Sequence, residues 1–208
     1  MAPELFTIGH SNHSLPRFMA LLGMHAIELV CDVRSTPYSR FNPQFNRETL
    51  QAALKAGGMD YLYLGSALGG KPRDRGRGTG TATGSEGTRD RGAVTEIAVG
   101  FRCRTRGTGS GATGSGYPTE EAARFALIAK SDRFRAGLEL LLKEARRRRT
   151  AMMCAEQDPA RCHRGLLICP SLPAEVTVRH ILSDGSLRQG LDAGTRTPSD
   201  DHGQPALF

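Results

Sequence analysis

Apolar positions in this chain alternate between short β-branched runs and longer segments with helical spacing. Helices are predicted from near Ser14, Asn46, Thr119 and Ser131, where a capping residue precedes a one-sided apolar pattern. Because strands and helices alternate, we expect one three-layer α/β domain with a mostly parallel sheet. The short runs that predict strands are residues 5–8, 27–33, 61–64, 150–154 and 176–182.

A Gly/Arg-rich, low-complexity insertion interrupts this pattern at residues 72–117. The stretch 71–116 contains 12 Gly in 46 residues and supplies five of the seven net positive charges, so the rest of the chain is nearly neutral. Such a composition buries too little apolar surface to order itself, although residues 93–101 have strand-like character. We expect a domain over residues 1–185, with the insertion mostly disordered. It is a flexible lid or a corrupted stretch, and residues 186–208 form a flexible tail.

Composition restricts the class of protein. No apolar run reaches about 18 residues, which argues against a membrane span. The first ten residues lack the features of a signal peptide, so we expect a cytoplasmic protein without a membrane partner. Five cysteines, an odd number, favour free thiols, a metal site or a redox pair over a disulfide framework.

The densest group of reactive side chains follows the predicted strand 150–154. Cys154, Glu156, Cys162, His163 and Arg164 lie within eleven residues, before apolar positions return. A loop that joins the carboxyl end of a strand to a helix is a common position for a site in α/β proteins. We expect Cys162, His163 and Arg164 in the first helical turn, where the helix dipole favours an anion and lowers the pKa of Cys162.

Other polar side chains follow the first two predicted strands. If these strands neighbour the strand 150–154, two carboxylates and two guanidiniums meet in one cleft. Arg34 and Arg164 would then hold an anion, while Asp32 or Glu156 moves a proton. The alternative is a structural ion-pair network. The remaining candidates for binding the anion are His10, Ser11 and Ser35.

The cysteines allow three interpretations. Thiolate and imidazole could bind zinc, but Cys154 and Cys162 do not form a CxxC pair and no second cluster exists, so we predict no metal. Cys154 or Cys162 could instead act as a nucleophile or as a redox pair. Both could also be packing residues, since free cysteine is among the most buried residue types. No cofactor can be named from the sequence.

Four motifs together resemble the DUF488 family. They are TIGHS at residues 7–11, DVRSTPYS at 32–39, YLYLGSALGG at 61–70 and CAEQDPARCHR at 154–164. The resemblance spans residues 5–70 and 119–185. It implies a compact α/β domain with these motifs gathered at one site, and it supplies no reaction.

The last five residues are a separate feature. The sequence Q-x-x-L-F, with Gln204, Leu207 and Phe208, resembles the short peptide by which bacterial replication and repair proteins dock on the DNA sliding clamp. Leu and Phe would enter an apolar pocket while Gln bonds at its edge.

Three functions therefore stay open. The first is an enzyme or binding protein that acts on a phosphate-bearing ligand, either a nucleotide or nucleic acid. The second is a non-catalytic DNA-repair or replication module recruited by the clamp-binding peptide and helped by the basic insertion. The third is a thiol-based redox protein.

Overall fold

The computed structural model describes residues 3–71 and 119–190. They form a six-stranded sheet with the strand order β3-β2-β4-β1-β5-β6. The first five strands pair in parallel, and β6 joins β5 in the antiparallel sense. The strands are β1 (Glu4–Gly9), β2 (Leu29–Asp32), β3 (Asp60–Tyr63), β4 (Thr150–Cys154), β5 (Thr177–Ile181) and β6 (Leu187–Gln189).

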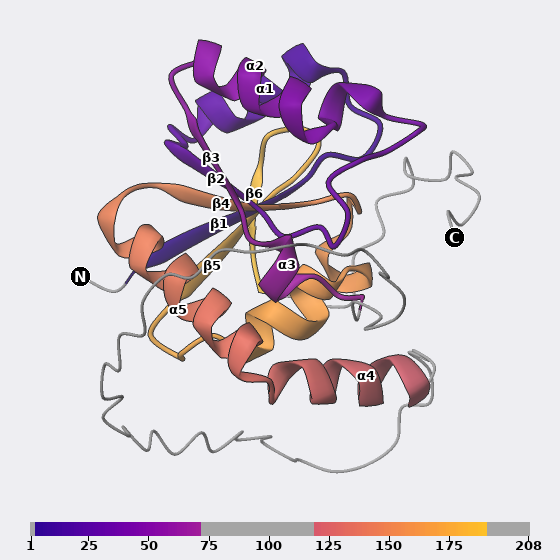
Figure 1. The fold of residues 1–208 in the computed structure, drawn as a ribbon. Helices are drawn as coiled ribbons and strands as arrows, with labels where there is room; N and C mark the ends of the chain where they lie inside the picture. The colour runs from indigo at the N-terminus through magenta and orange to yellow at the C-terminus, as the bar shows by residue number, and fades with distance from the viewer. Residues whose placement is uncertain (1–2, 72–118, 191–208) are drawn as a thin grey trace, which may run out of the picture. The chain divides into compact units, whose positions relative to one another are not determined.

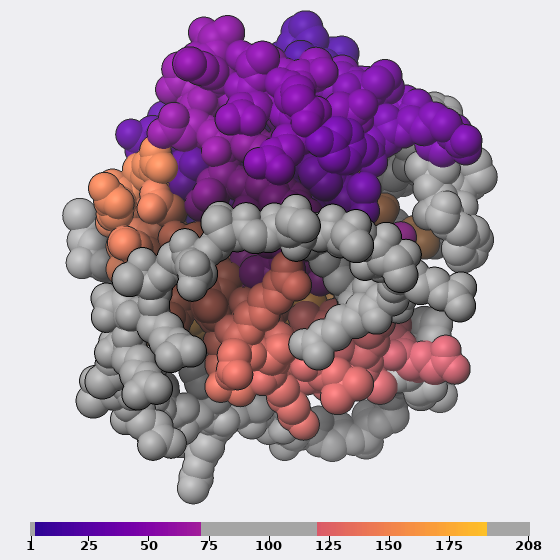
Figure 2. Space-filling model, viewed as in Figure 1, coloured from indigo at the N-terminus to yellow at the C-terminus, as the bar shows by residue number. Residues whose placement is uncertain are grey.

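Helices cover both faces of the sheet, which confirms the predicted three-layer α/β fold. In Figure 1, α1 and α2 lie above the sheet, and α3, α4 and α5 lie below it. Figure 2 shows the same division in space-filling form, with the side chains of α4 and α5 gathered below those of the N-terminal segments. The helices are α1 (Leu15–Met24), α2 (Arg47–Ala56), α3 (Gly65–Leu68), α4 (Thr119–Ala129) and α5 (Asp132–Arg147).

Each face of the sheet has its own apolar core because side chains alternate along a strand. On β4, Met152 and Cys154 face the core under α3, α4 and α5. Ala151 and Met153 face the other core, under α1 and α2. The same alternation places Cys31 of β2 in the first core.

The predicted helix starts are largely confirmed. Ser14 caps α1 by accepting a hydrogen bond from Arg17 N, and Ser131 caps α5 by accepting one from Phe134 N. The helix α2 does begin after Asn46, but the Asn46 side chain makes no capping bond. Its Oδ1 accepts a hydrogen bond from Ser39 N instead, and so fixes the loop between β2 and α2.

Two local predictions were wrong. The segment from residue 186 was expected to be loose, yet Leu187–Gln189 pairs with β5 through a turn in which Gly185 has a φ of +95°. The helix after β4 was expected to begin at Cys162. A 3₁₀ turn at Pro159–Arg161 comes first, and a single π-helical turn then covers Arg164–Ile168. Cys162 ends the 3₁₀ turn, so it does not lie within a helical first turn.

The insertion and the tail beyond residue 190 lie outside the described residues. The expected strand at 93–101 and the clamp-binding peptide at 204–208 therefore stay predictions. Within the described ranges, no helix has the length and apolar character that crossing a membrane requires.

Candidate functional site

The sheet order brings the predicted motifs together at the carboxyl ends of the parallel strands, which we call the carboxyl edge of the sheet. The central strand β4 lies between β1 and β2, with Gly9 opposite Cys154 and Asp32 opposite Met153. All three strands run in the same direction, so their carboxyl ends and the loops that follow them share one edge of the sheet. The edge is held by backbone bonds as well, since His10 N donates to the carbonyl of Cys154 at 2.9 Å.

Two cysteines and a histidine form a compact group on the α5 side of this edge. The Nδ1 atom of His163 lies 3.5 Å from Cys154 Sγ and 3.7 Å from Cys162 Sγ. Its other ring nitrogen, Nε2, lies 3.0 Å from the carbonyl oxygen of Val33. A carbonyl only accepts hydrogen bonds, so Nε2 carries a proton and Nδ1 is the atom that serves the two sulfurs.

The two thiols of this group differ in acidity. A hydrogen bond from Cys162, the charge of His163 and that of Arg164 hold the pKa of Cys154 well below its usual range, against the effect of burial. Burial, together with the neighbouring Cys154, raises the pKa of Cys162. The expected lowering of the Cys162 pKa was therefore wrong, because burial and Cys154 outweigh the charge of Arg164 and its backbone hydrogen bond. For comparison, burial raises the pKa of Cys31 in the core to about 12.

His163 completes this electrostatic group. Burial by itself would lower the pKa of His163, but the negative charge of Cys154 and the bond to Val33 raise it overall. Imidazolium and thiolate thus stabilise each other, as an acidic cysteine requires.

Arg164 is buried beside this group, with a relative exposure of 1%. Its Nη2 donates to the carbonyl of Gln157 at 2.6 Å. Its Nε and Nη1 are buried and have no hydrogen-bond partner. Among the described residues no carboxylate forms an ion pair with it, and its charge instead favours the ionised forms of Cys154 and Glu156.

Glu156 lies in the loop directly after β4. It is an exposed residue of that loop, yet burial of its carboxyl group and the nearby Cys154 raise its pKa, so the proton is held more tightly than in a free glutamate. The backbone of the loop packs closely on β1. A Cβ atom added to Gly9 would lie 1.9 Å from the carbonyl oxygen of Glu156.

A second polar group, on the α1 and α2 side, contains Asp32, Arg34 and His10. Arg34 pairs with Asp32 through Nε at 2.9 Å and Nη2 at 2.6 Å. Its Nη2 also donates to Phe45 O at 2.9 Å, and its Nη1 donates to His10 Nε2 at 3.2 Å. Each guanidinium nitrogen of Arg34 therefore already has a protein partner. This arrangement agrees with the alternative that Asp32 and Arg34 form a structural ion pair. Arg34 thus has no free N–H group to offer an anion.

His10 belongs to this second group as a neutral side chain. Burial and the neighbouring Arg34 lower its pKa to about 4. Its Nδ1 bonds to Ser11 O at 2.8 Å, and the ring stacks on Phe45 with centroids 4.4 Å apart. An uncharged ring with both nitrogens in use orients Arg34 and does not attract an anion.

The two serines have local roles. Ser11 adopts a φ of +45°, and its hydroxyl bonds to Asn12 at the surface. The hydroxyl of Ser35 accepts a hydrogen bond from Lys71 N at 3.0 Å. In the described structure, neither side chain forms a hydrogen bond with Cys154, Cys162 or His163.

Sequence reasoning missed several contributors. Tyr61 donates its hydroxyl to Asp32 Oδ2 at 2.8 Å, and buried His180 bonds to Thr7 Oγ1 at 2.7 Å. The position of Tyr61 could have been inferred, because strand alternation places it on the same face as Asp32. The partners of Arg34 and His163 include the backbone carbonyls of Phe45 and Val33, for which a sequence offers no signal.

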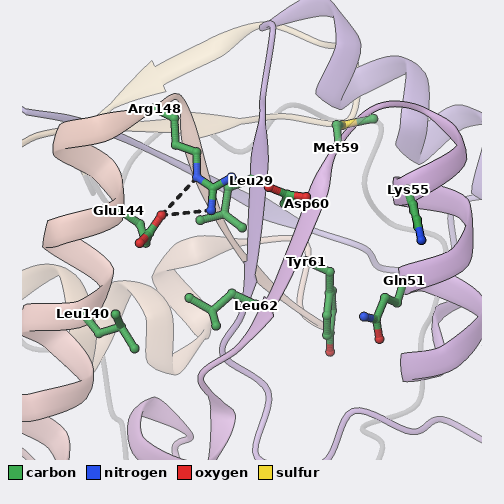
Figure 3. Close-up of a pocket in the computed structure, with 10 residues that line it drawn as sticks. All are labelled: Leu29, Gln51, Lys55, Met59, Asp60, Tyr61, Leu62, Leu140, Glu144 and Arg148. Carbon is green, nitrogen blue, oxygen red and sulfur yellow. Dashed lines mark hydrogen bonds and ion pairs between the residues drawn. The ribbon is translucent and has the colours of Figure 1, made fainter.

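Two hollows lie away from the carboxyl ends of the strands. One of about 400 Å³ lies at the β3 edge, with Asp60, Tyr61 and Leu62 between α2 and α5 (Figure 3). Another is lined by Glu4 and the arginines that follow α5. Figure 3 shows Glu144 and Arg148 bonded to each other on the α5 side of the first hollow. These charges satisfy each other, so we do not place the candidate site there.

The fold and this edge define an α/β domain with a buried Cys–Cys–His group and an adjacent buried arginine. A family model described as "Domain of unknown function DUF488" matches residues 14–87 and 104–169. The chain belongs to this family, as the four motifs indicated. No curated protein and no solved structure matches the chain.

Proposed function

We propose that this protein binds a phosphate-bearing ligand, a nucleotide or nucleic acid, at the carboxyl edge of the sheet and acts on it there. Support comes chiefly from one observation: Arg164 is 1% exposed, and two of its guanidinium nitrogens have no hydrogen-bond partner. A phosphate oxygen would supply what these N–H groups lack. Arginine is the residue that most often recognises phosphate by such bonds.

The energetic reason lies in the contrast between the two buried arginines. Arg34 is neutralised by Asp32 and has every nitrogen bonded. Arg164 has a single hydrogen bond, to a neutral carbonyl. Leaving a buried donor of a charged group unpaired costs about 1–3 kcal/mol or more. An anion that bonds to the unpaired nitrogens of Arg164 would remove this cost, and its binding is therefore favoured.

The other residues of the edge take these roles in the proposal. Arg164 holds the anion, and Glu156, with its carboxyl beside the same group, moves a proton during the reaction. Cys154 and His163 complete the charged surroundings. Arg34, Asp32 and His10 hold the loop after β2 in place.

Exchange of Arg164 tests the proposal. In Arg164→Met the apolar stem is kept and the charge is removed, so inorganic phosphate or pyrophosphate should bind at least about tenfold more weakly, the effect of about 1.5–3 kcal/mol for a charged hydrogen bond. Calorimetric titration measures the affinity. Arg161→Met, an exposed residue of the same loop, is the matched control. Equal affinity in wild type and Arg164→Met contradicts the proposal.

The stability of the same variant gives a second result. Arg164 has no carboxylate partner that its removal would leave uncompensated, and a buried donor without a hydrogen-bond partner costs the fold about 1–3 kcal/mol. The free energy of unfolding of Arg164→Met should therefore equal or exceed that of wild type. A loss above about 3 kcal/mol would show that Arg164 serves the fold and not a ligand.

Recruitment to the sliding clamp is the second candidate, and it is supported by Gln204, Leu207 and Phe208 in the sequence. It requires no site in the α/β domain. A pull-down of the clamp with the full chain and with a Leu207→Ala, Phe208→Ala variant tests it. Equal recovery of the clamp discards the hypothesis.

Thiol redox chemistry is the third candidate, and the proximity of Cys154 and Cys162 favours it, since their sulfurs lie within 4.8 Å. Both thiols would lose a proton and together two electrons to a disulfide oxidant such as oxidised glutathione, which is reduced to two thiols. Mass spectrometry of peptides after equilibration in glutathione buffers tests it. If no Cys154–Cys162 disulfide forms at any ratio, the hypothesis is discarded.

A further inference from the structure

We propose that Cys154, Cys162 and His163 form a binding site for zinc or another thiophilic divalent metal ion. The ligand atoms are the two sulfurs and Nδ1, which all lie within 4.8 Å of one another. Three protein ligands leave one coordination position for water or another exogenous ligand. This inference goes beyond the proposed phosphate binding and does not depend on it.

The distances between ligand atoms agree with tetrahedral coordination. Zinc lies about 2.3 Å from a cysteine sulfur and about 2.0–2.1 Å from a histidine nitrogen. At tetrahedral angles these bond lengths place sulfur and nitrogen about 3.5 Å apart. The two separations in the structure are 3.5 Å, from Cys154 Sγ to His163 Nδ1, and 3.7 Å, from Cys162 Sγ to the same atom. The site needs little movement to receive the ion.

The imidazole ring is already oriented as a metal ligand. Nε2 of His163 donates to the carbonyl of Val33 at 3.0 Å, which leaves the lone pair of Nδ1 directed at the sulfurs. Histidine ligands generally bind a carbonyl or carboxylate through the other nitrogen in this way. Packing fixes the ring as well, because an added Cβ at Gly70 would lie 2.8 Å from Cβ of His163.

The sulfurs are shielded from water and lie near a buried cation. Cys154 and Cys162 are 5% and 2% exposed, so water competes little for the ion. The guanidinium of Arg164 lies close enough to stabilise negative charge on both sulfurs. Two thiolates would neutralise a divalent ion, and the open position next to a buried cation would then suit an anion.

The spacing along the chain concealed this site. Seven residues separate Cys154 from Cys162, which matches no paired-cysteine pattern, and a sequence argument therefore predicted no metal. The chain returns through the 3₁₀ turn at Pro159–Arg161, where Asp158 Oδ1 accepts a hydrogen bond from Ala160 N. This turn places Cys162 beside the end of β4.

Titration with cobalt(II) tests the inference on the full chain. Metal is first removed with a chelator under reducing conditions, and Cys103→Ser is used as background to remove the thiol outside the described residues. We expect one equivalent of cobalt to bind, with a thiolate-to-metal charge-transfer band and the strong visible absorption of tetrahedral cobalt. Zinc should displace it.

Variants separate the site from unspecific binding. Cys162→Ser and His163→Gln should weaken cobalt affinity by more than the about 10–100-fold that loss of an outer-shell partner costs. Cys169→Ser, a cysteine of the following turn that is outside the group, should bind as wild type does. Circular dichroism of the metal-free variants confirms that each is folded.

Three results would overturn the inference. They are no charge-transfer band in folded wild-type protein, a band that persists in Cys162→Ser and His163→Gln, and binding that is lost equally in Cys169→Ser. Phosphate titration of the chelator-treated protein distinguishes the two proposals. If phosphate binds through Arg164 without metal and cobalt does not bind, only the metal site is wrong.

Discussion

His163 donates its Nε2 proton to the carbonyl oxygen of Val33, 3.0 Å away, and so joins the loop after β4 to the end of β2. The contact ties together two segments that are 130 residues apart in sequence. It also marks the boundary between two polar groups. Cys154, Cys162 and His163 lie on the α5 side of the sheet edge, while Asp32 and its partners lie on the α1 and α2 side.

The Asp32–Arg34 pair is predicted to hold the loop after β2. In Asp32→Asn the charge of Arg34, 5% exposed, loses its carboxylate partner. Breaking a buried pair in this way costs about 3–5 kcal/mol. Chemical denaturation measures the loss in the free energy of unfolding.

An exposed ion pair supplies the control for that measurement. Glu121→Gln breaks the pair with Arg124, whose side chains are 32% and 41% exposed, and should cost at most about 1 kcal/mol. Equal losses of unfolding free energy in Asp32→Asn and Glu121→Gln would show that the buried Asp32–Arg34 pair stabilises the fold no more than an exposed pair does.

Close packing of β1 on the loop after β4 gives a second prediction. In Gly9→Ala the new methyl group would meet the carbonyl of Glu156 at 1.9 Å, and a backbone atom cannot turn away as a side chain can. We expect a loss of about 1–3 kcal/mol, typical of overpacking. Gly23→Ala in α1, with nothing within 4 Å, should instead stabilise by about 0.5–1 kcal/mol. Thermal denaturation of both variants measures this difference, and a Gly9→Ala protein as stable as wild type would contradict the packing described.

His180 is predicted to destabilise the fold in acid. Burial and the charges of Arg164 and Arg188 lower its pKa from 6.5 to about 4, although Asp158 acts in the opposite sense. Between these pH values, His180 is therefore protonated in the unfolded chain and neutral in the folded chain. This contribution to stability is complete above pH 6.5 and is lost as the pH falls toward 4.

The measurement for His180 is a comparison of unfolding free energies across this pH range. His10 titrates in the same range, since its pKa is also lowered to about 4, so the difference between wild type and His180→Asn is the relevant quantity. Asn can still bond to Thr7 but cannot be protonated. If the two stability curves run parallel, His180 does not titrate as described.

The sequence predicted the architecture well because periodicity reports directly on burial. The run 150–154 is a fully buried central strand, and Ser14 and Ser131 cap the helices that follow them. The prediction that the motifs of β1, β2 and β4 share one edge is also correct, since parallel neighbours place their carboxyl ends together.

The arrangement within the edge could not be predicted in the same way. Whether Arg34 faces a ligand or Asp32 depends on the conformation of the loop after β2 and on the carbonyl of Phe45. The acidity of Cys154 depends on a turn that brings Cys162 and His163 back to the strand end. Backbone acceptors and irregular turns leave no periodic signal in a sequence.

A crystal structure of the full chain grown in phosphate tests the central claim most directly. The account predicts an anion bound at the guanidinium of Arg164, with oxygens at about 2.7–2.9 Å from the nitrogens that lack protein partners. Finding Nε and Nη1 of Arg164 bonded to protein groups, with phosphate absent from this edge of the sheet, would contradict it.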